Sequence, residues 1–427
     1  MKKFLIMLLS ILFMLCCLSF IGCKKDNGVK IYKVKNGISF VLQQDDTLAV
    51  YKLSDKKAKS ITIPASIDSK KVTYISSNAF YGAENLEKIV ISHTIEKIGA
   101  SAFEDCLKLS TVEFTTKEQG VDILGVKTIG AYAFKNTAVQ SLNLYGVNNI
   151  QDNAFNGCVN LASLTNTNNI KEIGSYAFAN CSSLQSIEFN YNGLSVGNYA
   201  FNNCSNLKNA TFTIVKNFGF AILQGCNSLQ NLTLTKISQD NNNHLGYFFG
   251  APTYQYNQNY IPTSLSKLTL IINTGLTEQS LYGCNSLKEI VITNSINMAK
   301  NTFNGCTNLQ SLTVSSLFVE DEENGYYLKL ADLFNSIPTS LTSFTLTKDE
   351  YLADNAFNNC VSLTNISLEK VNKIGKNAFA SCLNLTNITA KSGEWKTTIN
   401  SDFTNGVATE FTTNNLTTTY ANNYWYI

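Results

Sequence analysis

The chain contains twelve cysteines and two histidines, the residue types that most often act as nucleophiles or metal ligands. A thiolate or an imidazole can attack a carbonyl carbon or bind a metal ion when its spacing brings a partner close. No Cys-x-x-Cys pair occurs, and His93 and His244 lie far apart. Phosphate loops, dinucleotide fingerprints and serine elbows are absent from the sequence. We expect no enzyme, metal or other cofactor; an enzyme built on an acidic residue or a histidine stays open.

Nine of the cysteines mark one position of a repeat instead. The phrase Ala-Phe-x-x-Cys-x-x-Leu recurs along the chain, and successive cysteines are often 22 or 23 residues apart. In other repeats Ala83, Thr137, Ala251 and Ser336 fill the position. Because such a position needs a small, buried, weakly polar side chain, we expect reduced, inert thiols rather than disulfides or a metal site. The nine are Cys106, Cys158, Cys181, Cys204, Cys226, Cys284, Cys306, Cys360 and Cys382.

The fixed period predicts a solenoid, in which each unit buries its apolar residues against its neighbours. Counting the cysteine position gives fourteen units. In every unit an apolar residue lies three positions before the cysteine position, and we expect these apolar residues to stack as a column in the core. An aromatic ligand groove is the alternative. The column members are Phe80, Phe103, Phe134, Phe155, Phe178, Phe201, Phe248, Phe303, Phe357, Phe379 and Phe403, with Leu223, Leu281 and Leu333 elsewhere.

The residues after each Leu alternate between polar and apolar, as in residues 186–190. Period two places the apolar pair inside a strand and the polar residues outside. A second apolar patch such as residues 95–99 then closes the coil, and its glycine allows a backbone bend. We expect a leucine-rich repeat solenoid, with a parallel β-sheet on one face and short helical or irregular turns on the other.

Two lysines and an apolar run of residues 4–21 open the chain, followed by Gly22, Cys23 and a polar stretch. This segment resembles the signal peptide of a bacterial lipoprotein precursor, in which the cysteine receives the lipid and becomes the first residue. An uncleaved membrane anchor is the alternative, because 18 residues are near the minimum for a span. Both interpretations predict export and tethering to a membrane.

The repeat unit Cys-x-x-Leu-x-x-Ile-x-Ile…Val-x-x-Ile-Gly-x-x-Ala-Phe resembles the BspA-like, or Treponema-type, leucine-rich repeat over residues 61–410. The resemblance implies a surface-exposed protein, in several cases an adhesin for host matrix proteins or other cells. We therefore expect a lipid-anchored protein at the bacterial cell membrane or outer surface that binds a protein or a glycan. A structural envelope or coat protein without a specific ligand is the alternative.

The units also suggest a division of the chain. Residues 1–23 are the expected signal peptide, 24–60 a tether and N-terminal cap hairpin, and 411–427 a C-terminal cap with Trp425 as its lid. Solenoids need such covers at both ends. Three insertions interrupt the repeat, at residues 116–126, 236–264 and 317–340.

Two features of the expected surface are candidate binding sites. Threonine dominates the outward position of the strands. These threonines could form a hydroxyl-rich docking face, or they could be present only because threonine readily forms strands. Tyrosines gather in the second and third insertions, where loops of a repeat array often bind partners or simply enlarge a unit. The candidates are Thr211, Thr233, Thr269, Tyr247, Phe249, Tyr254, Tyr256, Tyr260, Tyr326 and Tyr327.

Charge argues against one class of partner. The net charge is +2, and only 15% of the residues are charged. The lysines are dispersed, without the basic patch and interleaved aromatic residues of a nucleic-acid surface. We therefore expect no nucleic-acid partner.

Overall fold

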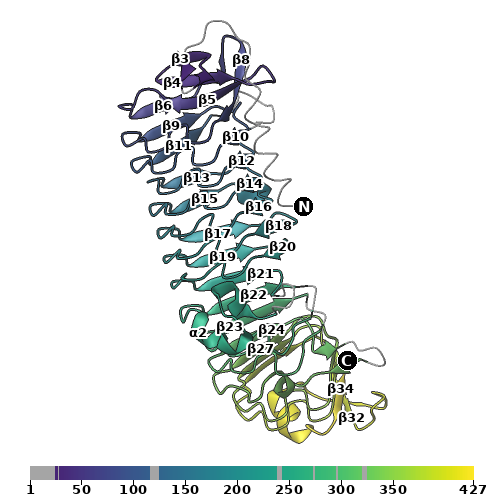
Figure 1. Cartoon of the computed structure of the whole chain (residues 1–427). Coiled ribbons are helices and arrows are strands. Elements are labelled where there is room, and N and C mark those ends of the chain that lie inside the picture. Colours follow the sequence, from purple (N-terminus) through teal and green to yellow (C-terminus); the bar gives the residue numbers. More distant parts are fainter. Residues whose placement is uncertain are drawn as a thin grey trace, which may run out of the picture. The chain divides into compact units, whose positions relative to one another are not determined.

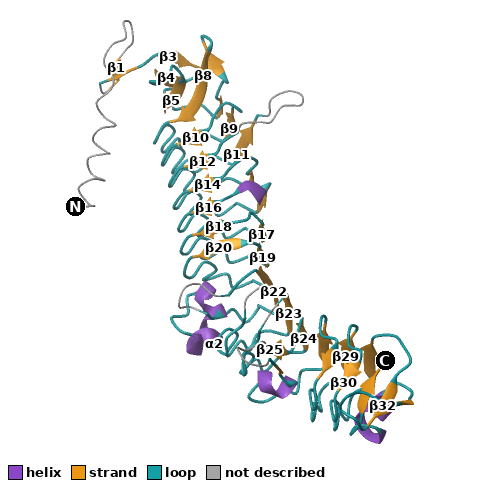
Figure 2. Cartoon of the chain, turned by 90° about the vertical axis from the view of Figure 1, so that its right-hand side faces the viewer, coloured by secondary structure: helices purple, strands orange, loops and turns teal. Residues whose placement is uncertain are grey.

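A computed structural model describes residues 25–26, 28–115, 125–237, 243–272, 275–294, 297–319 and 325–427. The chain divides into two compact units, residues 1–178 and residues 179–427. Each unit is a stack of coils made mostly of strands and loops, with few helices (Figures 1 and 2). The chain forms about fourteen turns, which confirms the predicted leucine-rich repeat solenoid.

Unit 1 begins with antiparallel strands that join the first coil. β1 (Lys25–Asp26) pairs with β2 (Val29–Lys30), and β3 (Lys33–Lys35), β4 (Ile38–Leu42) and β5 (Leu48–Leu53) form a meander. β5 then pairs in parallel with β8 (Lys70–Ile75), which also pairs with the short β7 (Ser66–Ile67). The inner side chains of this meander, among them Phe40 and Val50, are completely buried.

Two rows of parallel strands run along the coils of unit 1 (Figure 1). The first row, the strand face, contains β6 (Ser60–Thr62), β9 (Lys88–Ile91) and β11 (Thr111–Phe114), and then a separate pair, β13 (Ser141–Asn143) and β15 (Ser163–Thr165). The second row continues from β8 through β10 (Lys97–Ile98), β12 (Thr128–Ile129), β14 (Asn149–Ile150) and β16 (Glu172–Ile173). The second apolar patch therefore forms a second parallel sheet, which the sequence did not predict. A 3-10 turn, η1 (Thr167–Asn169), completes the unit.

Unit 2 carries a continuous sheet of nine parallel strands: β17 (Ser186–Phe189), β19 (Asn209–Phe212), β21 (Asn231–Leu234), β22 (Lys267–Ile271), β23 (Glu289–Thr293), β24 (Ser311–Val314), β27 (Ser343–Leu346), β29 (Asn365–Leu368) and β31 (Asn387–Ala390). β18 (Leu194–Val196) pairs with β20 (Val215–Phe218), also in parallel. β28 (Tyr351–Leu352) and β30 (Lys373–Ile374) join a mixed sheet with β34 (Tyr424–Tyr426), β32 (Lys396–Thr398) and β33 (Val407–Ala408).

The insertions of unit 2 add short elements to these sheets. They are η2 (Leu245–Phe249), η3 (Tyr254–Tyr256), α2 (Asn257–Tyr260), the hairpin of β25 (Phe318–Val319) and β26 (Tyr326–Tyr327), and η4 (Leu330–Leu333). A turn of π-helix, η5 (Asn415–Thr419), lies near the end of the chain.

The predicted phenylalanine column forms the core of unit 1. Phe80 and Phe103 stack with centroids 4.8 Å apart, Phe103 and Phe134 4.9 Å apart, and Phe134 and Phe155 5.3 Å apart. In unit 2, Phe357 and Phe379 stack at 5.5 Å with an interplanar angle of 8°. All these rings are buried, which confirms a core column rather than an exposed aromatic groove.

The column departs from the prediction at the insertions. In regular turns, the backbone N–H of a column Phe donates to the carbonyl of the residue that precedes the column Phe of the following turn. Phe80, for example, donates to Ala102, which precedes Phe103. Leu223 donates to the carbonyl of Phe248 and Phe303 to that of Leu333, which places Phe249 and Phe334 beside the preceding turn. Toward the following turn, Leu245 donates to Ser280 and Leu330 donates to Ala356, so the predicted Phe248 and Leu333 hold the column position on neither side. Leu245 and Phe249 are the first and last residues of η2, and Leu330 is the first residue of η4, so each 3-10 helix bonds to the preceding and the following turn through different residues.

Two further predicted positions also differ. Phe403 is only half-buried and meets Tyr351 edge-on at 6.0 Å, because residues 396–408 form an antiparallel hairpin rather than a regular coil. Ser336, predicted to replace a cysteine, is exposed because the turn after η4 no longer follows the regular register.

The nine repeat cysteines are all free and buried, as predicted. The thiol of Cys106 donates to the carbonyl of Phe80 at 3.0 Å, and that of Cys158 donates to Phe134 at 3.1 Å. The cysteine therefore satisfies the backbone carbonyl of the column residue one turn earlier. Thr137 fills the same position but donates to the carbonyl of Phe134 in its own turn, at 2.9 Å, so a small donor at this position can bond to a column carbonyl of either turn.

The glycine after the second apolar patch has a different role from the predicted bend. A Cβ on Gly130 would lie 2.6 Å from the carbonyl carbon of Gly99, and a Cβ on Gly99 would lie 2.5 Å from the backbone nitrogen of Ser77. Neither glycine has a positive φ. The glycine is therefore selected by the close approach of the neighbouring turn.

Candidate functional site

The threonine column predicted for the strand face of unit 2 is in register along all nine strands. Each member pairs with the next across the sheet, from β17 to β31. Because parallel strands lie about 4.8 Å apart, the side chains repeat at that spacing. The column consists of Glu188, Thr211, Thr233, Thr269, Val291, Thr313, Thr345, Ser367 and Thr389. We call it and the column beside it the threonine face.

The neighbouring column of this face carries amides and hydroxyls. Asn231 donates its Nδ2 to Oδ1 of Asn209 at 2.7 Å, and Asn387 donates to Asn365 at 2.8 Å. The one pair of opposite charges in this column, Lys267 and Glu289, forms an ion pair at 2.7 Å. The column consists of Ser186, Asn209, Asn231, Lys267, Glu289, Ser311, Ser343, Asn365 and Asn387. The threonine face is thus polar and almost neutral.

The tyrosine candidates of the second insertion differ in exposure. Tyr256 and Tyr260 are 48% and 41% exposed, whereas Tyr247 and Tyr254 are half-buried. Tyr247 meets Phe220 edge-on at 5.3 Å, and Tyr254 meets Tyr282 in the same way. Phe249 is 2% exposed and belongs to the core, so it presents almost no surface to a partner.

A buried asparagine organises this insertion. Asn257 Oδ1 accepts the N–H of Gly246 at 3.1 Å and lies 2.9 Å from Nδ1 of His244, while its Nδ2 donates to the carbonyl of Tyr282 at 2.8 Å. Burial lowers the pKa of His244, which therefore stays neutral, and its Nε2 has no hydrogen-bond partner among the described residues. We assign His244 and Asn257 a structural role; the sequence offered no signal for Asn257.

The third insertion presents one exposed tyrosine. Tyr326 is 43% exposed, whereas Tyr327 is half-buried between Phe318, at 5.0 Å, and Tyr351, at 5.2 Å. Asp349 accepts the N–H of Leu317 at 2.8 Å, and burial raises the pKa of this carboxyl. The acidic residues 320–323 lie outside the described residues.

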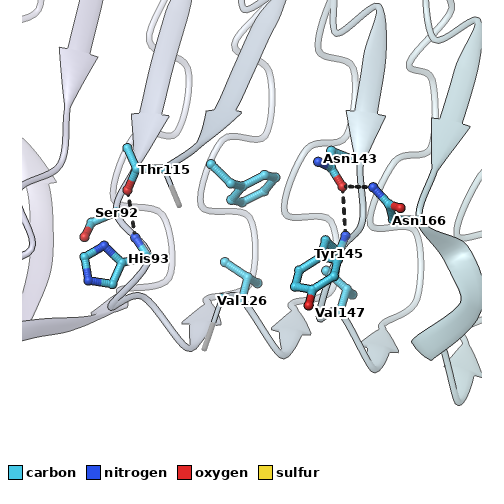
Figure 3. A pocket seen from close by; sticks show the side chains of 10 residues that line it. Ser92, His93, Thr115, Val126, Asn143, Tyr145, Val147 and Asn166 are labelled. Atoms are coloured by element: carbon cyan, nitrogen blue, oxygen red, sulfur yellow. Dashed lines mark hydrogen bonds between the residues drawn. The ribbon is translucent and has the colours of Figure 1, made fainter. Parts of the chain in front are cut away.

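A pocket of about 200 Å³ opens in unit 1, where the strand face is interrupted between β11 and β13 (Figure 3). We call it the β11–β13 pocket. His93 donates its backbone N–H to Oγ1 of Thr115 at 3.0 Å. Oδ1 of Asn143 accepts the N–H of Tyr145 at 3.0 Å and Nδ2 of Asn166 at 2.8 Å. The sequence did not predict this pocket; its only signal was the first insertion, at 116–126, of which residues 116–124 lie outside the described residues.

The thiols and the remaining ligand-type side chains show no reactive arrangement in the described ranges. Burial raises the pKa of Cys106 and of Cys158 to about 12, so both thiols are protonated at neutral pH. Within the same ranges, no group of three or more His, Cys, Asp or Glu side chains is placed to hold a metal ion. No described helix is both long and apolar enough to cross a membrane. Cys23 and the rest of the predicted signal peptide lie outside the described residues.

Several solved structures of leucine-rich repeat proteins are similar to this chain. A leucine-rich cell surface protein from Faecalibacterium prausnitzii is 20% identical over 84% of this chain and 95% of its own, with a TM-score of 0.41. A leucine-rich repeat protein from Bacteroides ovatus is 21% identical over 84% and 94%, with a TM-score of 0.36. The pneumococcal vaccine antigen PcpA is 19% identical over 83% and 92%, with a TM-score of 0.29. These likenesses concern the fold.

No curated protein matches the chain. The model of the BspA-type leucine-rich repeat region, by contrast, matches residues 47–123, 126–247, 258–328 and 331–426. These ranges cover most of the sequence and include both units. The chain therefore belongs to the BspA-type leucine-rich repeat family.

Proposed function

We propose that this chain is an exported, lipid-anchored surface protein that binds another macromolecule, a protein or a glycan, through its threonine face. The family and the solenoid fold are typically non-catalytic, which favours a binding role over an enzyme. The observation that carries the proposal is the unbroken register of the nine strands in unit 2. Such a sheet holds its outward side chains in place before a partner arrives, so binding costs little ordering entropy.

The dimensions of the threonine face set the expected affinity. Nine parallel strands span roughly 38 Å, and the four residues of a strand, of which alternate ones face outward, span about 13 Å. The resulting area, on the order of 500 Å², is smaller than the ~800 Å² that each partner buries in a standard stable complex. We therefore expect moderate affinity for a single contact, and tighter attachment where many anchored copies meet a repeating partner.

The chemistry of the face narrows the class of partner. Threonine, serine and asparagine dominate both columns, and the pair Lys267 and Glu289 neutralises itself. Outside this ion pair, Glu188 is the one charged residue of the two columns, so a strongly charged partner would lose hydration here with little counter-charge in return. A neutral polar partner, such as an extended peptide strand or a glycan, fits hydroxyls and amides that donate and accept hydrogen bonds.

Binding should be measured with the full chain displayed on cells, against a panel of matrix proteins and glycans. Thr233→Lys places a charge at the third of the nine strands and should weaken the strongest binding about tenfold or more. Thr307→Lys is the matched control, because Thr307 is exposed on a turn outside the strands. Equal binding by both variants would remove the threonine face as the binding site. No saturable binding to any probe would favour a structural envelope protein.

The ends of the chain are proposed as covers. Residues 24–60 would form a tether and the first cap, supported by the pairing of β5 with β8 and by the buried Phe40. Residues 411–427 would form the other cap, supported by Trp425, which is 1% exposed, and by the pairing of β34 with β30 and β32. Both arrangements protect the apolar residues of the outermost coil from water.

A further inference from the structure

The β11–β13 pocket arises from a break in the strand face of unit 1. β9 and β11 pair over four residues and β13 and β15 pair over three, but β11 and β13 belong to separate sheets. Phe114 therefore pairs with Ile91 on one side only and remains half-exposed. Its counterpart in unit 2, Phe212, pairs with Phe189 on one side and with Leu234 on the other and is completely buried. The break thus exposes an apolar ring that the regular repeat would cover.

The pocket combines apolar surfaces with uncharged polar groups. Figure 3 shows His93 and Ser92 on one side and Tyr145, Asn143 and Asn166 on the other, with Val126 between them. Tyr145 is 51% exposed, so its side chain is accessible to a ligand. No Asp, Glu, Lys or Arg is among the lining residues, which leaves no counter-charge for an ionic ligand.

Several polar groups of the pocket are free to meet a ligand. Asn143 Oδ1 already accepts two hydrogen bonds, which fixes the orientation of the amide and leaves its Nδ2 as a donor. Nδ2 of Asn166 is used in that bond, which leaves its Oδ1 as an acceptor. These two atoms, the ring nitrogens of His93 and the hydroxyl of Tyr145 have no partner among the residues that the structure describes.

The size of the pocket limits the ligand to one small ring. A cavity of about 150 Å³ holds a benzene molecule, and drug-sized ligands occupy roughly 300 Å³ or more. The observed volume of about 200 Å³ lies between these values. A purely apolar ring would leave the amides of Asn143 and Asn166 without partners, which costs binding energy. A ring with an apolar face and hydroxyls at its edge would satisfy both kinds of surface.

We propose that the β11–β13 pocket binds one neutral pyranose residue of a glycan. The ring of Tyr145 and the side chains of Phe114 and Val126 contact the C–H groups of the sugar. Asn143 Nδ2 donates to a sugar hydroxyl, and Asn166 Oδ1 and the imidazole of His93 form further hydrogen bonds at the ring edge. This site lies in unit 1 and is independent of the threonine face of unit 2, so either proposal can fail without the other.

The test is ligand-observed saturation-transfer NMR on the full chain in detergent micelles, with the methyl glycosides of glucose, galactose, mannose and N-acetylglucosamine. At least one glycoside should bind with a dissociation constant on the order of 1 mM, as expected for one small ring. Tyr145→Ala should weaken this binding about tenfold. Asn143→Asp keeps both acceptor contacts of this residue but removes its donor and adds a charge, so it should weaken binding to a similar degree.

Tyr81→Ala is the matched control, because Tyr81 is 55% exposed in the same unit and does not line the pocket. It should leave the binding unchanged, and the thermal transition of each variant reports whether the fold is intact. Three results would overturn the proposal: no glycoside binds, Tyr145→Ala binds as well as the original chain, or N-acetylphenylalaninamide displaces the sugar with higher affinity. The third result would identify the pocket as a receptor for an apolar side chain of a protein.

Discussion

Residues in the left-handed region of φ are the clearest sites of local strain in this chain. Most turns place Asn, Gly, Asp or Ser there, residue types that adopt a positive φ at low cost. Ile214 is an exception, with a φ of 58° although its side chain is β-branched and 53% exposed. Its backbone carbonyl accepts the N–H of Gly193, which holds a φ of 90° in the preceding turn.

Ile214→Gly should therefore stabilise unit 2. Removing the Cβ relieves about 1–2 kcal/mol of left-handed strain, partly offset by ~0.5–1 kcal/mol of added entropy in the unfolded chain. We expect a net gain of about 1 kcal/mol, measured as a higher urea midpoint.

Gly193→Ala provides the reverse comparison. A Cβ on Gly193 would meet nothing within 4 Å, so this substitution changes strain without a clash. We expect a loss of about 1 kcal/mol or more. Unchanged urea midpoints for both variants would show that the left-handed backbone at Ile214 and Gly193 does not strain the folded chain.

The buried thiols lead to a prediction about pH. The pKa of Cys158 is raised by burial from 9.0 to about 12. The folded state therefore favours the neutral thiol, and this contribution is complete below pH 9 and is lost as the pH rises from 9 towards 12. We expect alkaline denaturation in this window, followed by circular dichroism, with alkylation by iodoacetamide only as the chain unfolds.

Cys158→Ala tests the assignment of this effect. The variant should lose about 1 kcal/mol at pH 7, because the smaller side chain leaves a cavity in the core and removes one of the hydrogen bonds to the carbonyl of Phe134, which keeps Thr137 as a donor. It should also show a smaller loss of stability between pH 9 and pH 12. Rapid alkylation of Cys158 in the folded chain at pH 8 would contradict the burial of the thiol column.

At the scale of elements, the insertions decide how far the repeat tolerates irregularity. The second insertion contains η2, η3 and α2, which are too short to be stable alone. Asn257 links them through three hydrogen bonds, to Gly246, His244 and Tyr282. One buried side chain thus adds to the backbone hydrogen bonds that link the insertion to its neighbouring turns, among them Leu223 to Phe248 and Leu245 to Ser280.

Asn257→Ala should therefore loosen this insertion selectively. The loss of three buried hydrogen bonds costs several times the ~1 kcal/mol of a single bond, which is enough to open a short segment. We expect faster cleavage by chymotrypsin at Tyr254, Tyr256 or Tyr260, with little change in the far-ultraviolet spectrum of the sheets. Asn259→Ala is the control, because Asn259 is exposed on the same helix. Equal cleavage of both variants would show that Asn257 does not hold the insertion.

The elements also show which parts of the fold were predictable. The threonine column follows from a fixed period, because constant spacing places the same strand position above itself in each turn. The displacement of Phe248 from the core column was not predictable, because η2 bonds to the preceding turn through Phe248 and to the following turn through Leu245, and no local motif marks this change. The β11–β13 pocket was not predictable either, since it depends on two strands failing to pair, which only coordinates reveal.

At the scale of the whole molecule, we expect binding to depend on the attachment of the repeat array to a membrane as well as on the surface of the array. A repeat array offers contacts that are weak individually, and tethering many copies to one membrane raises their effective concentration. The expected tether is the lipid on Cys23, with the polar residues that follow it as a spacer. A single lipid chain gives only marginal membrane binding, whereas two or more chains hold a protein stably.

Cys23→Ser should release the chain from the membrane or block its maturation. With Cys23 intact, cells fed a radiolabelled fatty acid should label this protein, and the protein should remain in the membrane fraction after a high-salt wash. The serine variant should lose the label, because an oxygen cannot replace the thioether that carries the diacylglycerol.

Cys17→Ser is the control, because Cys17 is preceded by Cys16 and lacks the small residue that precedes Cys23. Retention of the label in Cys23→Ser, or of membrane attachment without any label, would favour an uncleaved apolar anchor formed by residues 4–21. In that case the array would still be held at the membrane, but by a span of the bilayer rather than by lipid.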